Sequence, residues 1–370
     1  MATKNIFDHF NDLSDPRSDN CRHNLIDIIT IAISASICGA DKWDDIEVFG
    51  KAKESWLRNF LELPHGIPSH DTFARVFAML DPQKLEQCFA SWIQALDPVK
   101  KDELINIDGK TVRRSHGKSC SAIHMVSAWA NAAGLVLGQR KIHDKSNEIT
   151  AIPELLDALQ IEGCIVTIDA MGTQKRIAEK IVEKQGDYIL ALKGNQGTLA
   201  EDVTLFFEGA EKLQSPTETI DYYRSFDKDH GRLEIREYWV SDDIEWLSQR
   251  QEWKGIRSLC MMRTQREIDG KRSSEKLYYI SSCKADAPRL ASAIRGHWGI
   301  ENSLHWVLDI AFREDECRKR KENSAQNFSL MRRITLNLLK QETACKRSIA
   351  GKRLLAGWDT GYLEKVLFKV

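Results

Sequence analysis

The chain has 370 residues, of which 42% are hydrophobic and 29% are charged, and its formal net charge is −1. This composition excludes a disordered chain, and the length allows two or three domains of roughly 100–200 residues each. No apolar run approaches the roughly 18 residues that cross a bilayer, and no signal-peptide pattern opens the chain, so we expect a cytoplasmic protein without a membrane segment. The nine cysteines are scattered and form no Cys-x-x-Cys pair, which argues against a structural zinc site.

The charge is distributed unevenly along the chain. Residues 1–100 contain 10 Lys/Arg and 15 Asp/Glu, whereas residues 313–353 contain 12 and 5. Local Lys and Arg groups bind a polyanion by displacing its counterions, so the basic segment is a candidate nucleic-acid contact. A solvated helix surface is an equally good explanation of the same charges.

Residues 1–98 are predicted to form an all-helical N-terminal domain. The apolar run from Asn24 to Cys38, followed by Gly39, indicates a long buried helix, and Ser69 is a suitable N-cap for a later one. A turn and a short helix there carry three polar side chains that could read DNA, His70, Thr72 and Arg75. A plain helical bundle is the alternative, and the acidic charge of this region favours it.

Residues 99–199 show an alternation of strands and helices. The predicted elements are strands at 104–108, 122–130 and 135–142, a helix at 149–159, a strand at 164–169, a helix at 173–184 and a strand at 187–193. This order is typical of the ribonuclease-H-like fold. The first and fourth strands each end in one aspartate, Asp108 and Asp169. An isolated buried charge is too costly, so two such acids predict a divalent-cation site.

Residues 200–285 are predicted to form a mostly β insertion, with strands at 221–226, 232–240, 256–264 and 276–282. One strand face there would carry His230, Arg232, Glu234 and Arg236, either solvated or laid along phosphates.

Residues 286–370 return to helices and are predicted to hold the remainder of the core and a basic C-terminal region. His297, Glu301 and His305 are four residues apart and therefore share one helix face. We expect Trp298, Trp306 and the apolar residues of this segment to anchor the helix in the core. A salt bridge to Arg295 is the alternative explanation of Glu301.

Five stretches together resemble the DDE transposases of bacterial insertion sequences, especially the branch with the H-repeat-associated proteins of Rhs elements. They are Asn106-Ile107-Asp108-Gly109-Lys110, Lys145-Ser146-Asn147-Glu148-Ile149, Thr167-Ile168-Asp169-Ala170-Met171, Leu192-Lys193-Gly194-Asn195-Gln196 and His297-Trp298-Gly299-Ile300-Glu301-Asn302. The resemblance covers essentially the whole chain. It implies a ribonuclease-H-like catalytic core, interrupted by a β insertion before the helix that carries the glutamate.

The resemblance also implies that Asp108, Asp169 and Glu301 are the catalytic triad and the metal ligands. Related transposases with such insertions often carry a Tyr, an Arg and a Lys around this glutamate. Here those positions hold Ile294, His297 and Leu308, so His297 or Arg295 would take over the phosphate contact.

The implied activity is that of an endonuclease and strand-transfer enzyme acting on the ends of an insertion element. Two divalent ions about 3.5–4 Å apart suit this chemistry, and three carboxylates favour Mg²⁺ or Mn²⁺ over zinc. We expect Asp108 to bridge both ions, with Asp169 and Glu301 holding one each. Pairing two ends requires two protomers, so by analogy we expect a homodimer on DNA. The candidate DNA-binding residues are Lys110, Arg113, Arg114, Lys193, Asn195, Arg232, Arg236, Arg295 and His297.

Two other functions remain open at the level of sequence. One is a catalytically silent or domesticated DNA-binding protein derived from a transposase, and the other is a ribonuclease-H-like nuclease or resolvase. A structural zinc protein is a further possibility, against which the cysteine spacing argues.

Overall fold

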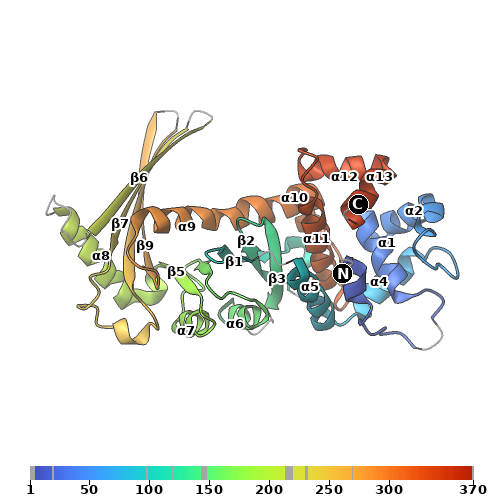
Figure 1. Cartoon of the computed structure of the whole chain (residues 1–370), viewed down its shortest axis with the longest axis horizontal. Helices are drawn as coiled ribbons and strands as arrows, with labels where there is room; N and C mark the ends of the chain where they lie inside the picture. The colour runs from blue at the N-terminus through green and yellow to red at the C-terminus, as the bar shows by residue number, and fades with distance from the viewer. Residues whose placement is uncertain are drawn as a thin grey trace.

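A nine-stranded mixed sheet runs through the elongated molecule, with strand order β3-β2-β1-β4-β5-β9-β8-β7-β6 (Figure 1). The computed structural model describes residues 5–18, 21–96, 99–117, 121–142, 148–212, 220–229, 232–268 and 270–368. The strands are β1 (Leu104–Thr111), β2 (His124–Ala130), β3 (Leu135–Ile142), β4 (Ile165–Ile168), β5 (Asp187–Leu192), β6 (Ile220–Asp229), β7 (Arg232–Ser241), β8 (Ser258–Ile268) and β9 (Lys271–Ser281).

The centre of the sheet consists of the parallel strands β1, β4 and β5. Their core residues are fully or almost fully buried, as continuous apolar strands covered on both faces should be. In the register of β1 and β4, Ile107 lies opposite Ile168. Asp108 and Asp169 each follow that pair by one residue. The two aspartates therefore lie at the same level, Asp108 within β1 and Asp169 directly after β4.

The element order predicted for residues 99–199 is confirmed: three strands, α6 (Glu148–Ala158), β4, α7 (Lys175–Glu183) and β5. The boundaries differ from the predicted ones by a few residues. Helices α6 and α7 lie beneath the sheet in Figure 1. The assignment of this arrangement to the ribonuclease-H-like fold, and the four domain boundaries, stay predictions.

The β-rich segment belongs to the same sheet as the core. Its last strand, β9, pairs antiparallel with β5, and β8, β7 and β6 follow outward as antiparallel neighbours. These long strands rise from the body of the molecule in Figure 1. A helix that the sequence pattern did not indicate, α8 (Gly197–Lys212), precedes them. His230 and the side chain of Arg232 lie outside the described part of the structure.

Helix α9 (Ala287–Ile300) runs along the opposite face of the sheet from α6 and α7 (Figure 1). It continues through a π-helical turn (Glu301–His305) into α10 (Trp306–Phe312). Glycines allow the close approach to β1: a Cβ at Gly296 would collide with Leu104, and one at Gly299 would collide with Asn131. This contact sets the height of Glu301 above the sheet.

The N-terminal helices pack against the C-terminal ones (Figure 1). The first group is η1 (Ile6–Phe10), α1 (Leu25–Ile37), α2 (Trp43–Ala52), α3 (Glu54–Leu57), α4 (His70–Met79) and α5 (Pro82–Leu96). The second is α11 (Ser324–Gln341), α12 (Ile349–Trp358) and α13 (Thr360–Phe368). Polar contacts join them, because Trp56 Nε1 donates to Glu364 at 2.6 Å and Arg353 Nη2 donates to the carbonyl of Ser36 at 2.9 Å.

Part of the positive charge of residues 313–353 is buried. Arg332, Arg333, Lys352 and Arg353 are at most 6% exposed, and Arg333 lies 3.0 Å from the fully buried carboxylate of Glu314. These cations hold helices together and are unavailable to a polyanion. The exposed cations include Arg313, Arg318, Arg320 and Lys321. The charge run therefore overstates the surface available to nucleic acid.

Within the described residues, no helix combines the length and the apolar character needed to cross a membrane.

Candidate active site

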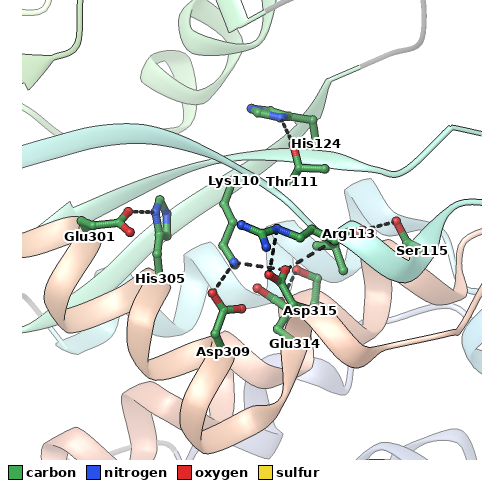
Figure 2. Close-up of polar contacts among 12 residues, drawn as sticks. Lys110, Thr111, Arg113, Ser115, His124, Glu301, His305, Asp309, Glu314 and Asp315 are labelled. Atoms are coloured by element: carbon green, nitrogen blue, oxygen red, sulfur yellow. Dashed lines mark hydrogen bonds and ion pairs between the residues drawn. The ribbon is translucent and has the colours of Figure 1, made fainter.

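Three side chains from β1 and from the π-helical turn meet at one point. His305 Nδ1 lies 3.1 Å from Glu301 Oε2 and 3.4 Å from Asp108 Oδ2 (the glutamate contact is drawn in Figure 2). Donor atoms of the three groups all lie within 4.8 Å of one another. His305 is 3% exposed, whereas the Glu301 side chain is 54% exposed. The site is therefore open to solvent on the glutamate side.

The carboxyl group of Asp108 is strongly perturbed. Burial is the largest cause, and the negative charges of Asp169, Glu148 and Glu301 add to it; together they raise its pKa to about 7. Burial and Glu148 also raise the pKa of Asp169. Acids crowded in this way repel one another, and a bound cation would relieve that repulsion.

Asp169 begins the turn after β4, and its Oδ1 accepts a hydrogen bond from the Gly172 amide at 3.2 Å. The turn is fixed from the short 3-10 helix after β5 (Gly194–Gln196), because Asn195 Nδ2 donates to the carbonyl of Ala170 at 2.6 Å. Asp169 is not part of the compact group formed by Asp108, Glu301 and His305. It influences that group through charge, from the end of the neighbouring strand.

A chain of hydrogen bonds fixes α9 on the sheet. Thr167 on β4 donates to Asn106 Oδ1 on β1 at 2.9 Å, and Asn106 Nδ2 donates to the carbonyl of Gly296 at 2.8 Å. His297 Nδ1 lies 2.9 Å from the same threonine hydroxyl. Burial and the neighbouring His305 lower the pKa of His297 to about 4. In this structure His297 is thus a neutral group that faces the sheet.

Two groups that were not predicted as site residues lie close to Asp108. His305 is one. Its spacing of four residues from Glu301 places both side chains on one helix face, and this spacing could have indicated it. Glu148 at the start of α6 is the other; it lies 2.7 Å from His124 Nε2. A Cβ at Gly109 would collide with both partners of this pair, so the glycine after Asp108 leaves the space they occupy.

Lys110 is already paired with two carboxylates. Its Nζ lies 2.7 Å from Asp309 Oδ2 and 3.3 Å from Asp315 Oδ1, and its side chain is 10% exposed (Figure 2). It joins β1 to α10 and to the segment that follows. Arg113, which also contacts Asp315, is 80% exposed, and Arg114 beside it is exposed.

The remaining predicted phosphate contacts are in different environments. Arg236 is 5% exposed and pairs with Glu234 at 2.6 Å and with Asp227. Arg295 pairs with Asp227 at 3.0 Å and is half exposed. Lys193 is exposed and lowers the pKa of Asp169 by its charge. Of the three, Lys193 is the one whose charge acts on an acid of the site and which has no ion pair among the described residues.

The prediction that Trp298 and Trp306 anchor the helix in the core is wrong. Their exposed fractions are 54% and 59%. The expectation that the apolar residues anchor the helix is confirmed, because Ile294, Ile300, Leu304 and Leu308 are at most 4% exposed. Ile294 and Leu308, at the expected Tyr and Lys positions, are thus apolar core residues. Helical spacing alone could not tell which face the sheet would cover.

Most of the chain matches the domain models of one known family. The model of the "Transposase DDE domain" covers residues 100–338, and an associated domain model covers residues 7–93. The chain belongs to the DDE transposase family.

Two curated relatives match nearly the full length of this family member, and a third matches about three quarters of it. It is 41% identical to the "H repeat-associated putative transposase YhhI" of Escherichia coli (strain K12), over 99% of this chain and 98% of the relative. It is also 41% identical to the "Putative transposase YncI" of Escherichia coli O157:H7, over 99% of this chain and 95% of the relative. A protein from Xanthobacter autotrophicus, described as "Uncharacterized protein in dhlA 3'region", is 44% identical over 74% and 93%. The predicted resemblance is confirmed.

Proposed function

We propose that this protein is an active DDE transposase, which binds the ends of an insertion element and catalyses metal-dependent DNA cleavage and strand transfer on a ribonuclease-H-like core. The observation that carries the proposal is the convergence of Asp108 and Glu301, from β1 and from the helix across the β-rich segment, with Asp169 at the end of the adjacent parallel strand.

The donor set fits a hard divalent cation. Asp108 and Glu301 offer carboxylate oxygens within 4.8 Å of each other, and the raised pKa of Asp108 reflects charge repulsion that a cation would offset. Asp108, Glu301 and Asp169 would hold Mg²⁺ or Mn²⁺. When bound, such a cation lowers the pKa of an attacking water or hydroxyl and stabilises charge on the leaving oxygen.

The protein's own contribution is to fix the acids and to position the DNA. The hydrogen bonds from Thr167 and Asn106 to α9 hold Glu301 over the sheet, and the Asn195 contact holds the turn that carries Asp169. Three exposed cations lie near Asp315, because Arg113 contacts Asp315 and Arg320 donates to the carbonyl of Arg114. These cations would contact phosphates without reading the sequence. Such a positively charged rim suits a backbone contact next to the reacting phosphodiester.

Three of the predicted phosphate contacts do not belong in that set. Arg236 and Lys110 are already neutralised by carboxylates, and His297 is uncharged near neutral pH. We therefore propose Arg113, Arg114 and Lys193 as the phosphate contacts among the predicted residues. Arg295 would have to leave Asp227 to join them.

The test is a supercoiled plasmid that carries the DNA flanking the gene, incubated with the purified protein and Mg²⁺ or Mn²⁺. Wild type should nick the element ends and join them to target DNA. Asp108→Ala should bind the ends but lose cleavage and joining by at least about 100-fold, because a metal ligand is gone. Lys276→Ala, on the distant β9, serves as the matched control. Cleavage by the Asp108 variant at the wild-type rate would overturn the assignment.

The alternative is a catalytically silent DNA-binding protein of the same family. This alternative is favoured by Ile294, His297 and Leu308, which stand where related transposases often carry Tyr, Arg and Lys. A shift of end DNA without nicking, by a wild-type protein that binds Mn²⁺, would support this alternative. Cleavage without joining would indicate a nuclease.

A further inference from the structure

The position of His305 inside the acid cluster is not explained by the proposed carboxylate chemistry. Its Nδ1 lies 3.1 Å from Glu301 Oε2 and 3.4 Å from Asp108 Oδ2. Ligands at about 2.0–2.2 Å from one cation lie roughly 3 Å from each other. The two contacts are thus at the separation of atoms that share a cation.

The backbone around the histidine is unusual in the same place. The π-helical turn begins at Glu301 and ends at His305, between two stretches of regular helix. Such turns insert one residue into a helix and occur often at functional sites. Here the turn spans the two side chains that face Asp108.

The second ring nitrogen of His305, Nε2, is buried and makes no hydrogen bond within the described residues. No group therefore fixes the tautomer from behind. Without a cation, Nδ1–H can donate to Glu301; with the proton on Nε2, the Nδ1 lone pair faces the space between the carboxylates. The change moves one proton within the ring and leaves the net charge unaltered.

We propose that His305 Nδ1 is a third ligand, with Asp108 and Glu301, of one cation in this site, and that it biases the site toward Mn²⁺ over Mg²⁺. The inference rests on the proposed function, because it assumes that the carboxylates hold a divalent cation. Mg²⁺ prefers an all-oxygen, partly hydrated environment. An imidazole nitrogen suits first-row transition ions better, and Mn²⁺ accepts both kinds of donor.

The competing role is that of a positioning residue, which only donates a hydrogen bond to Glu301. His305→Asn separates the two roles. The asparagine amide can place an N–H close to the position of Nδ1, but it removes the imidazole. A purely positioning role should survive this change in large part.

The experiment is a titration of the full-length chain with Mn²⁺ alone, followed by electron paramagnetic resonance and spin-echo modulation. We expect ¹⁴N modulation from a directly bound imidazole in wild type and its loss in His305→Asn. The Mn²⁺ dissociation constant should rise roughly 10–100-fold, the range seen when a supporting group of a metal site is removed, while Mg²⁺ affinity from competition changes less. Glu301→Gln should weaken both ions and keep the ¹⁴N signal.

Bound Mn²⁺ without ¹⁴N modulation in wild type would overturn the ligand role of His305 and leave the carboxylate site intact. This measurement needs no variant, so it stands even if His305→Asn folds poorly. Absence of Mn²⁺ binding by wild type would overturn both the inference and the metal-dependent function. An unchanged preference for Mn²⁺ over Mg²⁺ in a folded His305→Asn would overturn the claimed bias.

Discussion

At the scale of single residues, the acids of this site oppose folding in the absence of a cation. Asp108 is only about a quarter exposed, and three other carboxylates contribute to its raised pKa. An acid whose pKa rises on folding stabilises the fold while it is protonated. Its contribution is fully present below the unfolded-state pKa, near 3.8, and is lost as the pH rises through about 7.

Asp108→Asn should therefore stabilise the metal-free protein at neutral pH. The difference in unfolding free energy between variant and wild type should grow from pH 4 to pH 7 and then level off, with an upper bound of about 4 kcal/mol. Thermal melts in EDTA across this range measure it. With Mn²⁺ the order should reverse, because only wild type retains the ligand. A pH-independent difference would contradict the assigned cause.

At the scale of elements, the position of Glu301 depends on how closely α9 lies on β1. The helix is apposed at Gly296 and Gly299, where a methyl group would meet Leu104 or Asn131. The chain meets this requirement with two glycines three residues apart, on one face of the helix. Glycine destabilises a helix relative to alanine, but only glycine leaves room for this close packing.

Gly299→Ala should lower both stability and activity. Overpacking typically costs about 1–3 kcal/mol, and lifting the helix moves Glu301 away from Asp108. Gly209→Ala in α8 is the matched control, because it meets no atom within 4 Å and should stabilise that helix slightly. Chemical denaturation and plasmid nicking measure the two effects. Equal behaviour of the two variants would show that the close approach is unimportant.

At the scale of the whole molecule, helices from the two ends of the chain pack against each other. Helices α1, α4 and α5 pack against α11 from the other end of the chain, and α1 also contacts α12 and α13. The buried Arg353 reaches back to the carbonyl of Ser36 and to Asp41, at 2.9 and 3.2 Å. An N-terminal fragment would lose the ring partners of Trp43 and Phe60, whose centroids lie 5.0 Å from Phe328 and 5.2 Å from Phe368.

A fragment of residues 1–98 should consequently fail to fold alone. We expect weak helical circular dichroism and no cooperative melt, because the faces that α11–α13 cover would meet water. Adding a second fragment of residues 99–370 should restore a cooperative transition. A fragment that melts cooperatively by itself would instead support an independent N-terminal domain.

The sequence by itself determined the order of elements from β1 to β5 and assigned one aspartate to each of two core strands, although β1 continues beyond Asp108 to Thr111. Alternating apolar runs and turn residues are local signals, and each aspartate directly follows such a run. The resemblance also implied a catalytic role for Glu301; the family match confirms the resemblance, and the role of Glu301 stays a prediction.

Only the tertiary structure decided which charged and aromatic groups face water. Arg236 and Arg333 read as surface cations but are buried against carboxylates, while Trp298 and Trp306 read as core anchors and are exposed. The same holds for His305, whose role depends on Asp108 from a distant strand. Burial and pairing are properties of what packs opposite a residue, and a pattern along one chain segment does not contain that information.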